Sequence, residues 1–215
     1  MSVIATRPGR QGEAMEIDEA ARRRLIRTVA EAVIEHADEL TVLDQAIGDG
    51  DHGLNMKRGF EAVLADLDRL AAQPLPEAVH EVGMVLVMHV GGASGPLFGT
   101  LLLQLGSSLP ERPNRADLAA AFAVAVAAVK ARGRSDAGSK TLLDVLVPVQ
   151  AALAEGDPAE LPALADAAAA ATVPMQALRG RASFLGARSI GHLDPGARSA
   201  ALMVRAAYEA LAAGA

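Results

Sequence analysis

The 215-residue chain contains no cysteine and no tryptophan, and aromatic residues make up only 2% of it. Without cysteine, the chain can form no disulfide framework and offers no thiol nucleophile, which is compatible with a cytoplasmic protein. Because aromatic residues are so scarce, the hydrophobic 51% of the chain must build its core from Ala, Leu, Val and Met. This mixture favours closely packed helices over sheets.

Two further absences limit the possible partners. The formal net charge is −6 and the sequence contains no basic cluster, so we expect no nucleic acid partner. The longest uninterrupted apolar run, residues 118–129, is too short to cross a bilayer. Residues 1–15 include arginines but lack the apolar stretch of a secretory signal. We therefore expect neither a membrane partner nor export.

Apolar residues recur at helical spacing along most of the chain, beginning in residues 16–39. Further helices are predicted over residues 54–70, 77–90, 97–105, 116–130, 141–154, 158–173 and 195–211. No segment has the pattern of a strand. We predict an all-α protein of eight helices, with residues 1–14 as a flexible tail and residues 15–215 as a single domain.

An acidic segment between the first two predicted helices is the strongest functional signal. Asp44, Asp49 and Asp51 fall within eight residues and are interleaved with glycines that permit tight turns. Three carboxylates so close together repel one another unless a cation lies among them. Oxygen ligands without cysteine favour Mg²⁺, Mn²⁺ or Ca²⁺ over zinc. The segment therefore predicts a metal site, with a solvated turn as the alternative.

Three familiar motifs are excluded. Residues 48–53 match G-x-G-x-x-G, but a helix precedes them, whereas a dinucleotide fingerprint follows a strand. An EF-hand beginning at Asp49 would need glutamate where Phe60 stands. Residues 133–141 resemble a phosphate-binding Walker loop but have one residue too many before Lys140.

Two other segments suggest an anion site. Gly91 and Gly92 are followed by Ser94 and then by Pro96 near the start of an apolar helical run, a pattern typical of an exposed helix N-terminus. Free backbone N–H groups at such an end can bind phosphate. The alternative is a serine that merely caps the helix after a glycine hinge.

The second segment, residues 174–193, is an expected loop unusually rich in arginine and glycine. Its Arg181 is a candidate phosphate ligand, with an ordinary surface ion pair as the alternative. His52, beside the acidic segment, has three open roles: metal ligand, phosphate donor or carboxylate partner. A metal loop, a helix N-terminus and an arginine loop together indicate phosphoryl-transfer chemistry.

Three long motifs now identify a resemblance. Asp44 with Ile-Gly-Asp-Gly-Asp-His-Gly-Leu-Asn, then Gly-Gly-Ala-Ser-Gly-Pro-Leu-Phe-Gly-Thr, then Gly-Arg-Ala-Ser-Phe-Leu-Gly with Ser-Ile-Gly-His-Leu-Asp-Pro-Gly-Ala occur in this order. They resemble the nucleotide-binding L subunit of dihydroxyacetone kinase over nearly the whole chain after the tail. The resemblance implies an eight-helix antiparallel barrel or bundle with a nucleotide site at one end.

The resemblance also implies roles for individual residues. Asp44, Asp49 and Asp51 would coordinate two Mg²⁺ ions that bridge to the phosphates of ADP or ATP. The expected nucleotide-site residues are His52, Asn55, Ala93, Ser94, Gly133, Leu142, Arg181, Asp194, Pro195 and Gly196. The family often has methionine where Leu142 stands and an acidic residue where Ser139 stands, which should alter the packing on adenine but not the metal chemistry.

The resemblance further implies a division of labour between subunits. A separate K subunit would hold dihydroxyacetone through a histidine, so this chain contains no catalytic residue of its own. In the phosphotransferase-system type, bound ADP stays in place and an M subunit rephosphorylates it. A free-standing chain favours this type, and a homodimer is possible. The alternatives are an ATP-dependent kinase subunit for another small ketose or tetrose, and a nucleotide-sensing module without turnover.

Overall fold

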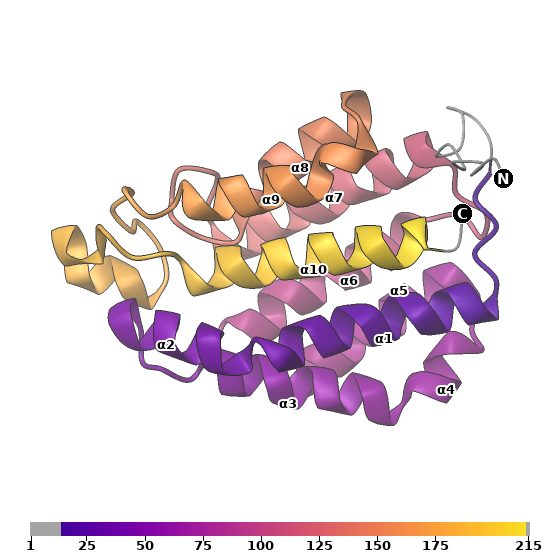
Figure 1. Cartoon of the computed structure of the whole chain (residues 1–215), viewed down its shortest axis with the longest axis horizontal. Helices are drawn as coiled ribbons and strands as arrows, with labels where there is room; N and C mark the ends of the chain where they lie inside the picture. Colours follow the sequence, from indigo (N-terminus) through magenta and orange to yellow (C-terminus); the bar gives the residue numbers. More distant parts are fainter. Residues whose placement is uncertain (1–13, 214–215) are drawn as a thin grey trace, which may run out of the picture.

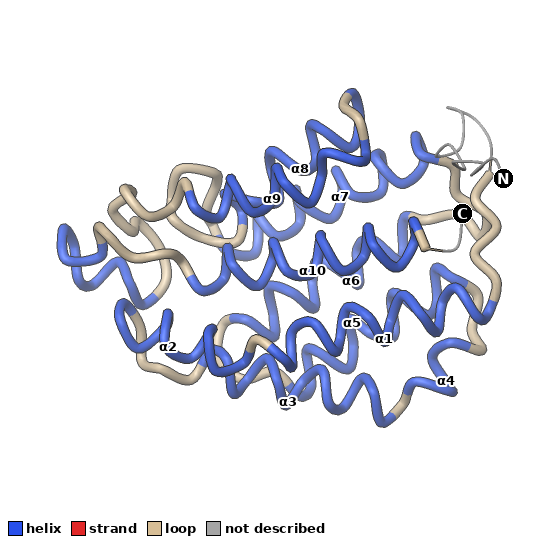
Figure 2. The backbone as a smooth tube through the Cα atoms, in the orientation of Figure 1, coloured by secondary structure: helices blue, strands red, loops and turns tan. Residues whose placement is uncertain are grey.

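The computed structural model describes residues 14–213, which form ten α-helices, two 3₁₀ helices and no strand (Figures 1 and 2). Residues 1–13 of the expected tail lie outside the described residues. The α-helices are α1 (Glu19–Glu35), α2 (Ala37–Ile47), α3 (His52–Ala65), α4 (Leu67–Ala71), α5 (Leu75–His89), α6 (Ser94–Ser108), α7 (Arg115–Gly133), α8 (Leu143–Glu155), α9 (Leu161–Ala170) and α10 (Pro195–Ala212). The 3₁₀ helices are η1 (Pro158–Glu160) and η2 (Arg181–Ser189).

The long helices form a closed ring in which each helix packs against its two neighbours. The order around the ring is α1, α3, α5, α6, α7, α8, α9 and α10, and α10 closes the ring against α1. Neighbouring helices run in opposite directions along the long axis of the molecule (Figure 1). The prediction of an all-α antiparallel barrel is therefore confirmed.

The first two predicted helices are each interrupted in the structure. The first predicted helix is interrupted at His36, and α2 then continues to Ile47, so Asp44 lies in a helix and not in the following loop. The second predicted helix begins two residues early, at His52, and is interrupted at Asp66. These one-residue interruptions divide two of the eight predicted helices, which gives ten. The additional helices α2 and α4 lie outside the ring, so the ring still consists of eight helices. The predicted loop 174–193 also contains η2, which periodicity did not indicate.

Small residues allow the helices to approach closely. Such close packing was expected from a chain with few aromatic residues to fill its core. A Cβ atom on Gly83 of α5 would lie 2.8 Å from the Leu103 nitrogen of α6. A Cβ atom on Gly106 of α6 would lie 2.5 Å from the His80 nitrogen of α5. Side chains at these positions would push α5 and α6 apart. The core is otherwise filled by Leu, Val and Ala, with Met56, Phe60 and Phe98 as its large members.

One end of the barrel gathers the connections that the sequence singled out. The loops after α2, α5, α7 and α9 lie at this end, together with η2 (Figure 1, left). The starts of α3, α6, α8 and α10 therefore point toward the same region. Both ends of the described chain lie at the opposite end of the barrel. Within residues 14–213, no helix combines the length and apolarity that crossing a membrane requires.

Candidate functional site

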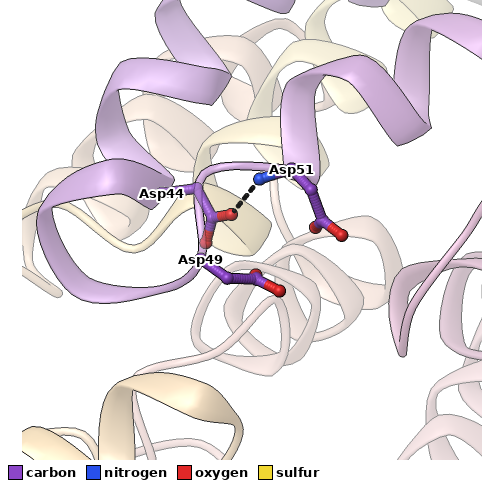
Figure 3. A group of neighbouring side chains, drawn as sticks. All are labelled: Asp44, Asp49 and Asp51. Carbon is purple, nitrogen blue, oxygen red and sulfur yellow. Dashed lines mark hydrogen bonds between the residues drawn. The ribbon is translucent and has the colours of Figure 1, made fainter.

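The three predicted metal ligands come together at this end of the barrel (Figure 3). Asp44 lies in the last turn of α2, Asp49 in the loop that follows, and Asp51 immediately before α3. One carboxylate oxygen from each residue lies within 4.8 Å of the others. Asp44 is buried, whereas Asp49 and Asp51 are exposed toward the pocket.

The loop is folded around the Asp44 carboxylate. The Oδ2 atom of Asp44 accepts hydrogen bonds from the backbone nitrogens of Asp51 (2.9 Å) and His52 (3.1 Å). A Cβ atom on Gly48 would lie only 1.9 Å from Asp44 Oδ1, so glycine is required there. Gly50 has φ +76°, a conformation that glycine adopts without strain. Asp44 therefore organises the loop backbone as well as offering an oxygen to a cation.

The donor set fits a hard divalent cation. All three groups are carboxylates, and no softer ligand lies among them. Arg181 pairs with this cluster, and its Nη2 atom lies 2.9 Å from Asp49 Oδ2. Both side chains of this pair are well exposed, at 67% and 36%, so the ion pair contributes little and can open to admit a ligand. The arginine loop thus reaches across the pocket to the acidic loop.

His52 is held between two serines, which argues against one of the three roles left open by the sequence, that of metal ligand. Its Nδ1 atom lies 2.9 Å from Ser94 Oγ and its Nε2 atom 2.7 Å from Ser199 Oγ. Because the Ser199 hydroxyl donates to the Pro195 carbonyl (3.0 Å), its oxygen accepts a hydrogen bond from the Nε2–H group of His52. Both ring nitrogens are occupied, so His52 is not free to ligate a metal. Burial lowers the pKa of His52, which favours the neutral ring.

The glycine–serine segment forms the exposed N-terminus of α6. Gly92 has φ +65°, and the helix begins at Ser94, earlier than predicted. The capping position is Ala93, and no side chain caps the helix. The alternative interpretation of Ser94 as an N-cap is therefore wrong, because its hydroxyl contacts His52 instead. The free backbone N–H groups and the dipole of this 15-residue helix face the pocket, where an anion would be stabilised.

The opposite wall is formed by the starts of α8 and α10. Asp194 caps α10 by accepting a hydrogen bond from the Ala197 nitrogen (2.7 Å). Burial raises the pKa of Asp194 to about 7, although its backbone hydrogen bonds oppose this shift. A Cβ atom on Gly196 would lie 3.1 Å from Asp194 Oδ2, so glycine keeps the entrance beside Leu142 open.

A single pocket brings together most of the predicted site residues. It is lined by Asp44, Asp49, Asp51, His52, Ala93, Ser94, Leu142, Arg181, Asp194, Pro195 and Gly196. Asn55 and Gly133 are predicted site residues that do not line it. Asn55 instead lies under the glycine turn, where a Cβ atom on Gly91 would be 2.5 Å from its Oδ1 atom. Gly133 ends α7 behind Leu97, which does line the pocket.

Several residues of the site were missed by the sequence analysis. Ser199 fixes the His52 ring, and Asp144 accepts hydrogen bonds from the backbone nitrogens of Gly138 (2.5 Å) and Thr141 (2.7 Å). Lys140 is almost fully buried beside them. No local signal marked the serine, which is an ordinary residue within an amphipathic helix. Asp144 stands in the first turn of α8, a position where an acidic residue is also expected without any functional role.

Comparisons with known proteins agree with this geometry. A family model described as "DAK2 domain" matches residues 46–209. The ADP-binding subunit DhaL of PEP-dependent dihydroxyacetone kinase 1 from Listeria innocua is 40% identical over 193 residues, which cover 89% of this chain and 96% of that protein. The corresponding subunit from Escherichia coli K12 is 42% identical over 180 residues, covering 79% and 86% of the two chains.

A solved structure shows the same fold. The crystal structure of the dihydroxyacetone kinase of C. freundii superposes with a TM-score of 0.70 at 25% sequence identity. The alignment covers 97% of this chain and 37% of that longer chain. The resemblance to the nucleotide-binding subunit of dihydroxyacetone kinases is confirmed by these matches. This chain belongs to the DAK2 domain family.

Proposed function

We propose that this chain is the ADP/ATP-binding subunit of a phosphotransferase-system-dependent dihydroxyacetone kinase. In this proposal the γ-phosphate of a Mg²⁺-bound nucleotide is transferred to dihydroxyacetone held on a separate K subunit. The observation that carries the proposal is the shared pocket, in which three carboxylates face the N-terminus of α6. A cytoplasmic location and the phosphotransferase activity of the assembled enzyme belong to the same proposal.

The chain's own residues suit the charge distribution of a nucleotide phosphate chain. Backbone N–H groups at Ala93 and Ser94 can position phosphate oxygens without carrying a net charge. Arg181 can turn from Asp49 to a phosphate, because their ion pair is exposed. Mg²⁺ held by the three carboxylates would neutralise phosphate charge in addition to the pocket arginines.

The proposed assembly assigns different tasks to different subunits. The pocket's one histidine is engaged by two serines, and the ammonium of its one lysine, Lys140, is bound by backbone carbonyls, so neither side chain is free to bind a ketone covalently. We therefore place substrate binding on the K subunit and rephosphorylation of the bound ADP on an M subunit. The names of the Listeria and Escherichia relatives as ADP-binding subunits support this division. A homodimer and two metal ions also remain part of the proposal.

A second candidate function is an ATP-dependent kinase acting on another small ketose or tetrose. The supporting observation is a D-erythrulose kinase from Mycolicibacterium smegmatis that is 34% identical to this chain. This chain spans only 34% of that longer kinase, whereas it spans 96% of the Listeria ADP-binding subunit. A nucleotide-sensing module is disfavoured, because sensing alone would not require three carboxylates beside the phosphate position.

The deciding experiment uses protein purified without added nucleotide. The protein is passed through gel filtration and denatured, the released nucleotide is chromatographed, and magnesium is measured in the same sample. Near-stoichiometric ADP is expected for a resident coenzyme that is rephosphorylated in place. An empty protein that binds and rapidly exchanges Mg·ATP would instead favour the ATP-dependent kinase. Failure to bind either nucleotide would refute both candidates.

A further inference from the structure

The segment that resembles a Walker loop contains the most buried charged side chain among residues 14–213. Lys140 lies between α7 and α8 with 1% of its surface exposed. Its φ is +60°, a left-handed conformation that a lysine adopts only where its surroundings fix the backbone. Asp144 supplies this constraint through its hydrogen bonds to Gly138 N and Thr141 N on either side. The turn thus directs the lysine side chain inward.

The ammonium group of Lys140 is surrounded by backbone carbonyl oxygens. Its Nζ atom donates to the carbonyls of His192 (2.6 Å), Ser189 (2.7 Å) and Met175 (3.0 Å), with the Val173 carbonyl at 3.5 Å. An ammonium has three N–H donors and no acceptor, so the three close carbonyls match it. We refer to these four carbonyls as the carbonyl cage.

The carbonyl cage favours the charged form of the lysine. Burial lowers the pKa of Lys140, while the nearby Asp194 carboxylate opposes this shift. A neutral amine would direct its lone pair at a carbonyl oxygen, which is repulsive. Among residues 14–213, the other hydrogen bond to these carbonyls comes from the Gly191 nitrogen, which donates to Val173 O (2.8 Å).

The carbonyl cage joins the two ends of the arginine loop. Val173 and Met175 stand where the chain enters this loop, and Ser189 and His192 where it leaves. Between them lie four consecutive residues that line the pocket, Arg179 to Ala182. A long loop whose ends are held together loses much of its conformational freedom. Together with the hydrogen bonds from Gly191 N to Val173 O (2.8 Å) and from Ala177 N to Ser189 Oγ (2.9 Å), the buried ammonium holds the ends of the loop that presents the arginines of the site.

We propose that Lys140 is a positioning residue for the arginine loop, and that the carbonyl cage is a latent site for a monovalent cation such as K⁺ or NH₄⁺. Rings of carbonyl oxygens replace the hydration shell of K⁺ in ion channels, and here the lysine ammonium occupies the equivalent position. The part of the proposal that concerns nucleotide affinity rests on the proposed function. The part that concerns cation binding and loop order does not.

Two variants of the full-length protein distinguish the effect of the lysine charge from the effect of the volume that its side chain fills. Lys140→Gly suits the positive φ and leaves room for an ion, whereas Lys140→Met fills the same space without a charge. In both variants, the amides of residues 174–193 should lose protection from hydrogen exchange, and ADP binding should weaken by about tenfold or more. Potassium or ammonium chloride should restore the protection in the glycine variant only. Sodium and choline chloride at equal ionic strength should not.

The outcomes distinguish the parts of the proposal. Unchanged loop protection in Lys140→Met would overturn the positioning role. Equal restoration by choline, or a glycine variant that folds in none of these salts, would overturn the cation site. If protection and cation rescue appear as expected while no nucleotide binds to any form, then the carbonyl cage stands and the proposed function fails.

The unsubstituted protein provides an independent measurement, because the chain has only three lysines. Lys57 and Lys130 are partly exposed, at 46% and 33% of their side-chain surface, and serve as internal references. Under native acetylation followed by peptide mass spectrometry, Lys140 should react far more slowly than both. In urea all three should react alike. Native reactivity equal to that of Lys57 would show that the ammonium is not enclosed and would overturn the proposal.

Discussion

The imidazole of His52 joins α3 to α10 through a 2.7 Å contact between its Nε2 atom and the hydroxyl of Ser199. These residues are 147 positions apart in the sequence. The other ring nitrogen accepts from Ser94 at the start of α6, so one ring connects three helices at the pocket. The hydrogen bond from Ser199 to the Pro195 carbonyl fixes the direction of this chain of donors and acceptors. His52 thereby sets the orientation of the Ser94 hydroxyl beside the anion site.

We predict that Ser199→Ala will disturb the His52 ring without unfolding the protein. The substitution leaves a buried N–H group without a partner, so the free energy of unfolding should fall by about 1–3 kcal/mol. Urea denaturation measures this loss, and ¹⁵N chemical shifts of the ring report its tautomer. Ser107→Ala, at an exposed position of α6, is the matched control and should change neither quantity. An Nδ1–H tautomer of His52 in the parent protein would contradict the proposed hydrogen-bond direction.

A second prediction separates two roles within the acidic loop. Asp49 is exposed and makes no backbone hydrogen bond in the structure described here, so Asp49→Asn should abolish phosphoryl transfer while leaving the helical circular dichroism nearly intact. Asp44 also accepts two backbone N–H groups, so Asp44→Ala should both remove metal binding and lower stability by about 1–3 kcal/mol. Full activity in Asp49→Asn would refute the metal assignment.

A third prediction concerns the shape of the loop and not its charge. Gly48→Ala retains all three carboxylates, but its Cβ atom would overlap Asp44 Oδ1 and displace that oxygen. We therefore expect Mg²⁺ affinity, measured by calorimetry with ADP present, to fall by about tenfold or more. Ser107→Ala is the control, because Ser107 is exposed near the C-terminal end of α6 and does not line the pocket. Equal Mg²⁺ affinity in both variants would show that Asp44 is not held as a ligand.

The architecture could be predicted because the helical periodicity of each segment and the overall composition of the chain indicate the same fold class. Helical periodicity and the small residues of the core specify helices that pack closely, and the ring has the eight positions expected. The interruption at His36 could not be predicted, because no proline or glycine marks it. There the chain bends while its backbone hydrogen bonds are largely maintained, and His36 Nδ1 bonds the Ala32 carbonyl (2.7 Å).

The site was predictable only where chemistry was concentrated in short motifs. The metal site could be predicted because three aspartates that would repel one another fall within eight residues, Asp44, Asp49 and Asp51. Lys140 and Ser199 could not be identified in this way, because their partners come from distant segments that only the closed barrel brings near. Asn55 was assigned to the nucleotide site by motif, yet it does not line the pocket and lies against Gly91, which sequence proximity to His52 cannot reveal.

A last prediction follows from the buried carboxyl of Asp194, whose pKa is raised from 3.8 to about 7. Because the folded state holds this proton more tightly than the unfolded state, the group stabilises the fold at low pH and loses that contribution as pH rises to about 7. Asp194→Asn keeps an oxygen that can accept from Ala197 N but cannot ionise. The variant should therefore gain stability relative to the parent between about pH 4 and 7, by at most ~1.4 kcal/mol per pH unit.

The measurement is urea unfolding of nucleotide-free protein at several pH values, with the difference between parent and variant isolating Asp194 from other titrating groups. Asp166→Asn serves as the control, since its carboxylate pairs with Arg205 near the surface and away from the pocket. The cause of the shift can be tested as well. Burial is the largest contribution and the nearby Asp144 charge adds to it, whereas Lys140 opposes it. In a Lys140→Met background, the pH at which Asp194 titrates should move still higher, and a shift to lower pH would contradict this electrostatic arrangement.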